Sequence, residues 1–296
     1  SVKVHMAVLS DREAARLLSR GLQVSEPALA EKLAIAEANL ISALQARNLE
    51  SQLDFGDTAM LRRFLVARKL QIEPTVEMLL KHLDWRKATL PIEMTPAVVT
   101  EIKKGKAFLR GRDLQGRPLV VIRSACFDPK TRDLEASVKA FVHELEEALR
   151  SMPEGQSQLS IFYDRTGFRL RNLDLEGVSR CVKVFSDNYP ERMGATYLFP
   201  AGMLASAVFK IVSSFMDART ASKVEFVKSA NRLWDILPPE SIPVQYGGTA
   251  PDAPDVDAAT EPDITEPDVY GTGFMDVGRL AEGEGGGECE PQATLA

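Results

Sequence analysis

Charged and hydroxyl side chains stand on both sides of an apolar stretch in the second half of the chain. The pair Glu191 and Arg192 precedes it, and the spacing Asp217-x-x-Thr220-x-x-Lys223 follows it. Carboxylate acceptors beside cationic and hydroxyl donors can make charge-assisted hydrogen bonds to a polar ligand. On charge pattern alone, a solvated ion pair remains the favoured interpretation of Glu191 and Arg192, and Asp217 is better explained as a helix cap.

A second pair of charged residues, Arg68 and Lys69, ends an amphipathic pattern that predicts a helix over 59–69. Basic residues in a last turn are favourable because they complement the partial negative charge at a helix C-terminus. On the residues alone, this structural role is the favoured interpretation of the pair.

Residues that could make or break covalent bonds are few. The chain has three histidines and three cysteines, and it contains no GxSxG turn, HExxH pair or glycine-rich phosphate loop. Cys126 and His143 could form a nucleophile and its base, but a core cysteine and an unrelated surface histidine explain them better. Glu146 and Glu147 are neighbours on a predicted helix and point apart. We therefore expect no enzyme activity, no catalytic residue, no metal site and no cofactor.

The apolar stretch itself divides into a strand and a helix. Residues 193–199 are apolar, aromatic or β-branched and end at Pro200, which cannot continue a ladder of hydrogen bonds. A helix follows from Met203 to Phe215, apolar over most of its circumference. At about 14 residues it is too short to cross a bilayer, which needs roughly 20. It must be buried in protein, or shared between protein and lipid.

The remaining periodicities predict the order of elements. Helical patterns cover 11–20, 27–48, 59–69, 74–87 and 96–104. Strand-like runs at 107–109 and 119–122 flank a turn and predict a hairpin, followed by helix 134–150, strand 159–163, helix 173–188, strand 223–227 and a short helix at 232–237. Strands that alternate with helices predict an α/β fold with a mainly parallel sheet and crossover helices, preceded by a small all-helical domain.

Charge is distributed unevenly along the chain. Residues 249–296 contain twelve acidic side chains and one basic one, so the rest carries a net charge of +5 against −6 for the whole chain. The acidic segment is rich in proline and glycine and is expected to be disordered. The mildly basic body is compatible with anionic membrane surfaces but is too weakly charged to indicate nucleic-acid binding. The N-terminal residues show no signal peptide and no membrane span, and we expect a cytoplasmic protein.

These residues together carry a resemblance to a known family. The order YPERMG, strand, apolar helix and Asp217-x-x-Thr220-x-x-Lys223 resembles the CRAL-TRIO lipid-binding family, in particular its phosphatidylinositol/phosphatidylcholine transfer proteins. LRRFLVARKL at 61–70, DWRK at 84–87, GRPLVVIR at 116–123 and PVQYGG at 243–248 support it. The resemblance implies an N-terminal extension at 1–24, a helical domain at 25–90, a lipid-binding domain at 91–248 and an acidic tail at 249–296.

The resemblance also implies a function without a catalytic step. The expected protein is a monomer that binds the membrane surface transiently and carries phosphatidylinositol between membranes or presents it to lipid kinases. A second lipid as further cargo is left open. Two alternatives stay open: a carrier of another hydrophobic ligand such as a sterol, tocopherol or retinoid, and a protein-interaction adaptor on the same fold.

Site residues follow from the same resemblance. The implied headgroup residues are Arg68, Lys69, Glu191, Arg192, Thr220 and Lys223. The implied gate helix and pocket residues are Met203, Leu204, Val208, Ile211, Val212 and Phe215, and the pocket strand contributes Leu159, Ile161 and Tyr163. Arg192 is expected to orient the carboxylate of Glu191. Fungal members that also carry phosphatidylcholine have hydroxyl residues where this chain has Leu159 and Ile161, and Ser160 should point to the other face of the strand.

Overall fold

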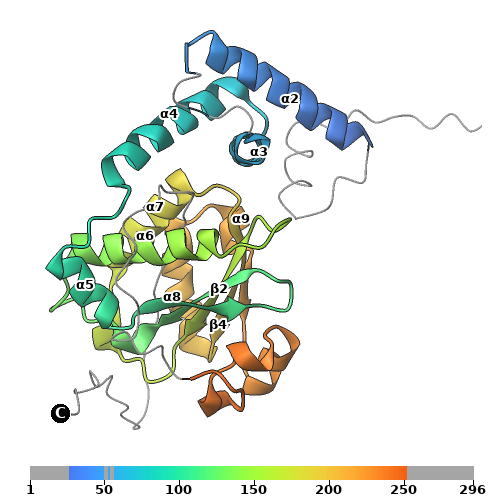
Figure 1. Ribbon diagram of the computed structural model, residues 1–296. Coiled ribbons are helices and arrows are strands. Elements are labelled where there is room, and N and C mark those ends of the chain that lie inside the picture. The colour runs from blue at the N-terminus through green and yellow to red at the C-terminus, as the bar shows by residue number, and fades with distance from the viewer. Residues whose placement is uncertain (1–26, 50–52, 54–56, 252–296) are drawn as a thin grey trace, which may run out of the picture. The chain divides into compact units, whose positions relative to one another are not determined.

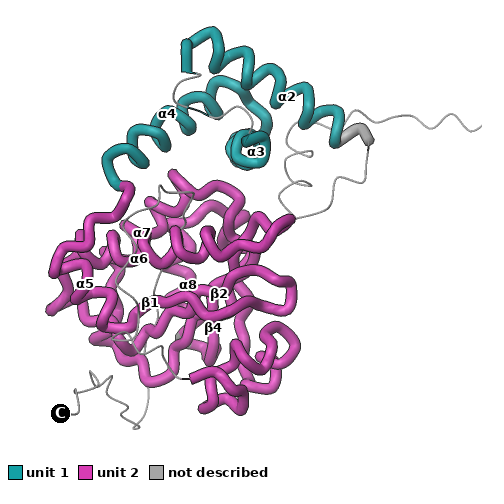
Figure 2. The backbone as a smooth tube through the Cα atoms, in the orientation of Figure 1, with its two compact units in different colours: residues 1–89 teal, residues 90–296 magenta. Residues whose placement is uncertain are grey.

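The structure, a computed structural model, describes residues 27–49, 53 and 57–251. The predicted helix over 11–20 and nearly all of the acidic tail lie outside these residues. The chain divides into two compact units, residues 1–89 and 90–296 (Figure 2). Each unit is described by itself.

The described part of the first unit is all helical. It contains α2 (Pro27–Gln45), α3 (Thr58–Ala67) and α4 (Ile72–Thr89) (Figure 1). The carboxylate of Asp57 caps α3 by accepting a hydrogen bond of 2.8 Å from the backbone N–H of Met60. Fully buried leucine and phenylalanine side chains from all three helices form the core: Leu40, Leu44, Leu61, Phe64, Leu65 and Leu79.

The second unit is built on a five-stranded sheet with the order β1-β2-β3-β4-β5. Strand β1 (Ala107–Arg112) is antiparallel to β2 (Pro118–Arg123), and the parallel strands β3 (Leu159–Asp164), β4 (Met193–Phe199) and β5 (Val224–Phe226) follow. The same unit contains helices α5 (Pro96–Lys103), α6 (Leu134–Arg150) and α7 (Leu175–Asn188). A short 3₁₀ segment at Ser124–Cys126 (η1) lies between β2 and α6, and another at Leu170–Asn172 (η2) lies between β3 and α7. The predicted mainly parallel α/β fold, preceded by helices, is confirmed.

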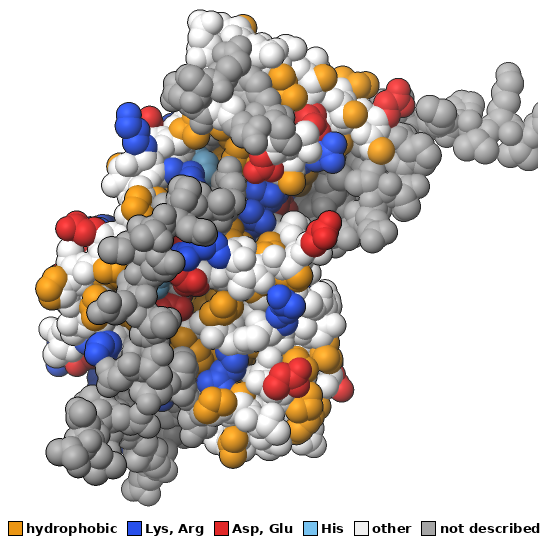
Figure 3. Space-filling view, in the orientation of Figure 1, with side chains coloured by type: hydrophobic (Ala, Val, Ile, Leu, Met, Phe, Trp, Pro, Cys, Tyr) orange, Lys and Arg blue, Asp and Glu red, His pale blue; other side chains and the backbone are white. Residues whose placement is uncertain are grey.

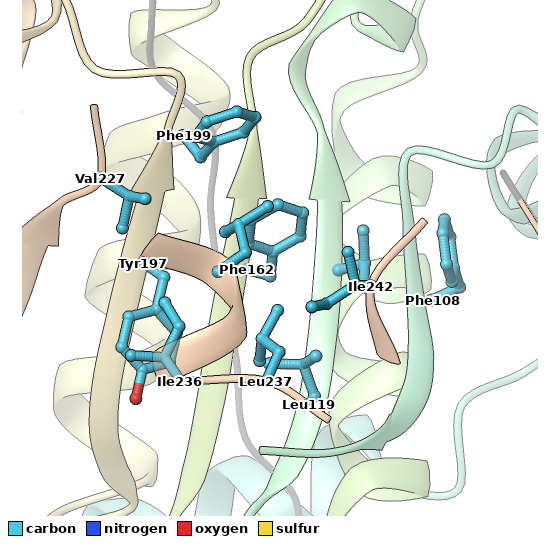
Figure 4. Close-up of a cluster of buried hydrophobic side chains, with 11 residues drawn as sticks. Phe108, Leu119, Phe162, Tyr197, Phe199, Val227, Ile236, Leu237 and Ile242 are labelled. Carbon is cyan, nitrogen blue, oxygen red and sulfur yellow. The ribbon is translucent and has the colours of Figure 1, made fainter. Parts of the chain in front are cut away.

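One face of the sheet is covered by the C-terminal segment of the described chain. The side chains of Leu119, Phe162 and Tyr197 project from β2, β3 and β4 on this face and pack with Ile236 and Ile242 (Figure 4). The segment runs through 3₁₀ turns at Ala230–Asp235 (η4), Pro239–Ser241 (η5) and Val244–Tyr246 (η6), where the sequence had predicted a short helix at 232–237. Figure 4 shows helices passing behind the strands, on the opposite face.

A buried polar network anchors the β1–β2 hairpin to this covered face. The carboxylate of Asp113 accepts hydrogen bonds from Arg117 Nε at 2.7 Å and from Ser160 Oγ at 2.6 Å, and Arg117 Nη2 donates to Tyr197 Oη at 2.9 Å. A Cβ on Gly194 would come within 2.6 Å of the Arg117 side chain, so any other residue there would require Arg117 to shift. Ser160 therefore points away from Leu159 and Ile161, as predicted.

Candidate functional site

The predicted gate begins as an α-helix and ends as a tighter turn. Helix α8 spans Met203–Val212, and the 3₁₀ turn η3 continues it over Ser213–Phe215. The hydroxyls of Ser213 and Ser214 donate to the carbonyls of Lys210 and Ile211, at 3.1 and 2.6 Å. Serine bonds of this kind compete with the helical ladder. The single helix predicted from Met203 to Phe215 therefore stops at Val212.

Helix α8 buries one face and exposes the other. Ala205, Val208 and Val212 are buried, and the Phe209 ring packs edge-on against Phe226 of β5, with centroids 5.3 Å apart. Three large apolar side chains point to solvent instead: Met203 is 95% exposed, Ile211 46% and Phe215 40%. The side chain of Leu204 lies outside the described residues. These three residues, Met203, Ile211 and Phe215, are here named the α8 patch, and their exposed apolar surface could be covered by lipid or protein.

The predicted pocket strand shares one face of the sheet with α8. Leu159, Ile161 and Tyr163 alternate with Ser160 and Phe162, so they face away from the C-terminal segment and toward the side where α8 packs. All three are buried. The hydroxyl of Tyr163 is buried too, and it has no hydrogen-bond partner among the residues that the structure describes. This face of β3 therefore offers apolar walls and one unsatisfied hydroxyl.

An apolar cavity, which sequence reasoning did not locate, lies between α5, β1, α6 and α7. Its empty space is about 570 Å³ when open solvent at the mouth is counted with it. Ala107 is in register with Ile122, and Ile122 with Tyr163, so the cavity opens over the face of the sheet that α8 also covers. Its walls are mostly apolar, contributed by Ile102, Phe127, Val138, Phe141, Val178 and Cys181. The predicted pocket residues do not line it.

The charged groups at the cavity are neutralised. Glu101 accepts hydrogen bonds from Lys104, Lys106 and Ser137, which outweigh its burial and lower its pKa to about 2. The Lys106 pKa is lowered by burial. Burial and the charge of Glu147 raise the pKa of Glu144 to about 8, so Glu144 is mainly protonated at neutral pH. The cavity thus contains no uncompensated charge and suits an apolar occupant.

A second cluster contains two of the predicted headgroup residues, Glu191 and Lys223, together with Arg219. Glu191 follows α7 with a left-handed backbone, φ 61°, and its Oε1 is ion-paired with Arg219 of α9 (Ala218–Ala221). Its Oε2 is buried and has no hydrogen-bond partner among the described residues. Burial raises the pKa of Glu191, against the lowering effect of Arg219 and Lys223. The Lys223 ammonium donates to the Met193 carbonyl at 2.6 Å, and burial lowers its pKa.

Thr220 lies beside this cluster on α9. Asp217 caps α9 as predicted, because its carboxylate accepts from the backbone N–H groups of Arg219 and Thr220, at 2.9 and 3.0 Å. Its second oxygen accepts from the Thr220 hydroxyl at 2.6 Å. Burial alone would raise the Asp217 pKa. The hydrogen bonds have the larger opposite effect, so the pKa lies below its usual value and the carboxylate stays ionised.

Arg192 does not orient Glu191 as the sequence had led us to expect. It is buried and its guanidinium donates to the Ser157 carbonyl at 3.0 Å. The left-handed backbone at Glu191 turns the two neighbouring side chains apart, and Arg219 is the residue that pairs with the Glu191 carboxylate.

Arg68 and Lys69 belong to the first unit. Arg68 is the C-cap of α3, and Lys69 and Leu70 both have left-handed backbones, with φ of 56° and 62°. The pair thus follows the helix rather than forming its last turn. Since the two units are described separately, the role of this pair in a headgroup site stays a prediction.

Comparisons with known proteins identify the domain. A family model described as CRAL/TRIO domain matches residues 102–248. These residues form a CRAL/TRIO domain, a lipid-binding fold. The Eremothecium gossypii protein named phosphatidylinositol transfer protein CSR1 is 26% identical, over 66% of this chain and 48% of its own length. The Arabidopsis thaliana phosphatidylinositol/phosphatidylcholine transfer protein SFH9 is 27% identical, over 63% of this chain and 36% of its own length.

A solved structure supports the fold of the CRAL/TRIO domain. The crystal structure of Sfh5 matches with a TM-score of 0.62 at 14% identity, covering 78% of this chain and 90% of that one. This similarity concerns the fold alone. The chain spans less than half the length of the two curated relatives named above.

Two findings on the described residues bear on the domain's relation to membranes. Among them, no helix is both long and apolar enough to cross a bilayer. On the face shown in Figure 3, basic, acidic and hydrophobic side chains are intermixed where the structure describes them. On that face, the described residues form no large field of positive charge.

Sequence reasoning missed two parts of the site. The cavity of the CRAL/TRIO domain is assembled from four elements, and no spacing along the chain marks it. Arg219 was overlooked because its partner Glu191 is 28 residues away. The sequence held one signal for Arg219, since it is an additional cation inside the Asp217-x-x-Thr220-x-x-Lys223 spacing.

Proposed function

We propose that the chain binds phosphatidylinositol in its CRAL/TRIO domain and exchanges it at membrane surfaces. The observation that carries the proposal is the cluster of Glu191, Arg219 and Lys223, which combines a free buried carboxylate oxygen with two cations. A phosphoinositol headgroup needs both, because its ring hydroxyls donate hydrogen bonds and its phosphate accepts them. Relatives named as phosphatidylinositol transfer proteins support the same ligand.

The apolar parts of the site match the acyl chains of such a lipid in chemistry. The cavity between α5, β1, α6 and α7 has apolar walls and neutralised charges. The α8 patch supplies an apolar contact with the bilayer during exchange. The chain would then attach to membranes peripherally and reversibly, and it could present the lipid to lipid kinases.

We also propose limits for the domains. Residues 25–90 would form the helical domain and residues from 91 onward the lipid-binding domain. Its C-terminal limit is better placed at Pro251 than at Gly248. The Thr249 N–H donates to the Pro239 carbonyl at 2.9 Å, and the Ala250 N–H to the Ile242 carbonyl at 3.0 Å.

The decisive experiment identifies the lipid directly. The full chain would be purified, its bound lipid extracted for mass spectrometry, and transfer of labelled phosphatidylinositol between vesicles measured. We expect phosphatidylinositol to co-purify and to be transferred. A protein that carries no phosphatidylinositol and does not accelerate its transfer would refute the proposal.

A second candidate ligand is favoured by one specific observation. Leu159 and Ile161 give β3 no polar atom toward the helices, while the Tyr163 hydroxyl on that face is buried without a described partner. A buried hydroxyl in this condition costs free energy that a ligand can recover. An apolar molecule with a single hydroxyl or carbonyl, as in sterols, tocopherols and retinoids, fits this face better than phosphatidylcholine. The same mass spectra would reveal it.

A further inference from the structure

Arg219 stands out because it joins two parts of the site that are distant in sequence. It projects from the four-residue helix α9, and its Nη1 pairs with Oε1 of Glu191 beyond the end of α7. The side chain of Arg219 is 29% exposed and that of Glu191 12%. The pair is therefore largely shielded from water, and its partners influence each other more strongly than a surface ion pair would.

The free oxygen of Glu191 needs an explanation. Oε2 is buried and accepts no hydrogen bond from any residue that the structure describes, while Oε1 is held by Arg219. An unsatisfied buried acceptor is destabilising, and more so when it is charged. Arg219 fixes the carboxylate so that this acceptor is kept in one orientation. The geometry is that of an acceptor prepared for a donor that the described chain does not provide.

The charges around Glu191 must also accommodate the phosphate of the ligand. A lone carboxylate would repel a phosphate, yet the proposed ligand must bring one close to Glu191. Asp217 is committed to capping α9 and to the Thr220 hydroxyl. The ion pair with Arg219 cancels the charge of Glu191, which leaves Lys223 as the cation available to an anion. Among the described contacts of the Arg219 side chain, only Nη1 is engaged, so its remaining N–H donors can reach an anion as well.

We propose that Arg219 determines the specificity of this site for an acidic headgroup that carries hydroxyls next to its phosphate. It positions and neutralises Glu191 so that Oε2 accepts a ring hydroxyl, and its free N–H groups bind the phosphate together with Lys223. A zwitterionic headgroup without hydroxyl donors would leave Oε2 unsatisfied and would bring a cation toward Arg219 and Lys223. The proposal rests on the proposed function and adds the residue that enforces its selectivity.

The test compares variants of the full chain in equilibrium loading from vesicles. Arg219→Gln removes the charge, Arg219→Lys keeps the charge but loses the planar fork, and Glu191→Gln removes the acceptor charge. Arg232→Gln is the matched control, because Arg232 forms exposed ion pairs with Glu225 and Asp235 and none with Glu191. The probes are labelled phosphatidylinositol, labelled phosphatidylcholine and soluble glycerophosphoinositol. The soluble probe separates recognition of the headgroup from capture of the whole lipid.

We expect Arg219→Gln to weaken phosphatidylinositol loading at least about tenfold, the effect of losing one charge-assisted hydrogen bond. Arg219→Lys should recover part of the loss, the control should match wild type, and phosphatidylcholine loading should not fall. The double variant combines Arg219→Gln with Glu191→Gln. If Arg219 acts through Glu191, its loss of phosphatidylinositol loading should be smaller than the product of the two single losses. Glycerophosphoinositol should show the same order of variants if the headgroup alone is recognised.

The outcomes separate this inference from the function on which it rests. Failure of the wild type to load phosphatidylinositol would overturn the proposed function and the inference with it. Normal loading by wild type and equal loading by Arg219→Gln would overturn the inference alone. Equal losses for both lipids would show that Arg219 only supports the fold. Multiplicative losses in the double variant would show that Arg219 does not act through Glu191. If Arg219→Gln unfolds, Arg219→Lys against wild type decides the same question.

Discussion

The α8 patch gives the sharpest test of how the protein meets a membrane. Met203 is 95% exposed at the first position of α8, so Met203→Ser should leave the packing of the domain intact. Full burial of a large apolar side chain contributes about 1.5–3 kcal/mol. If Met203 inserts into lipid, its loss should weaken binding to vesicles about tenfold to a hundredfold, since about 1.4 kcal/mol is a factor of ten.

The matched control is an exposed apolar residue elsewhere. Val244 is 60% exposed in η6, in the C-terminal segment that covers the opposite face of the sheet. Val244→Ser therefore removes a similar exposed apolar side chain from a surface that would not touch the bilayer. Co-sedimentation with electrically neutral vesicles isolates the apolar contribution. Unchanged binding of Met203→Ser, or an equal loss for Val244→Ser, would show that α8 does not meet the membrane. Val212 is unsuitable for this test because it is buried.

Three further predictions concern the headgroup, the cavity and the tail. Lys223→Ala should weaken phosphatidylinositol loading about tenfold while sparing a ligand held by its acyl chains, and equal losses for both would exclude a headgroup role. Because Glu144 has a pKa of about 8 when folded, it binds a proton that the unfolded chain releases above about pH 4.5. Wild type should therefore lose stability relative to Glu144→Gln from about pH 5 to 8 and then level off, as measured by urea unfolding; a constant difference would contradict the assigned burial. Truncation after Pro251 removes twelve acidic residues and one basic residue, so affinity for anionic vesicles should rise at low salt and the gain should shrink as salt screens it. Equal binding of both forms at low salt would argue against this role of the tail.

Local patterns predicted the elements well where a single signal decides them. Strand β4 covers Met193–Phe199 as expected, because an apolar run meets a proline that cannot extend the ladder. Helix α6 matches over Leu134–Arg150, where Asp133 supplies a cap and the apolar face is continuous. The end of α8 was predicted three residues too late, since the competing serine bonds depend on backbone geometry that the apolar pattern does not reveal.

The site was less predictable because its contacts are made in three dimensions. Adjacency suggested that Arg192 serves Glu191, but a left-handed residue between helix and strand sends the two side chains in different directions. The true partner, Arg219, is selected by how α9 docks beside the end of α7. Periodicity shows which face of an element is apolar, and it does not show which cation will approach a given carboxylate.

The short stretch of chain between the α8 patch and the headgroup cluster has a thermodynamic consequence. A single residue, Met216, separates the end of η3 at Phe215 from Asp217, which caps the helix that carries Arg219 and Thr220. A displacement of α8 and η3 would therefore also move the segment that we propose to contact the headgroup. By linkage, a headgroup that binds more tightly when α8 is closed must stabilise the closed arrangement by the same factor. Cargo recognition and retention would then be one coupled equilibrium, in which the wrong headgroup leaves the protein easier to open.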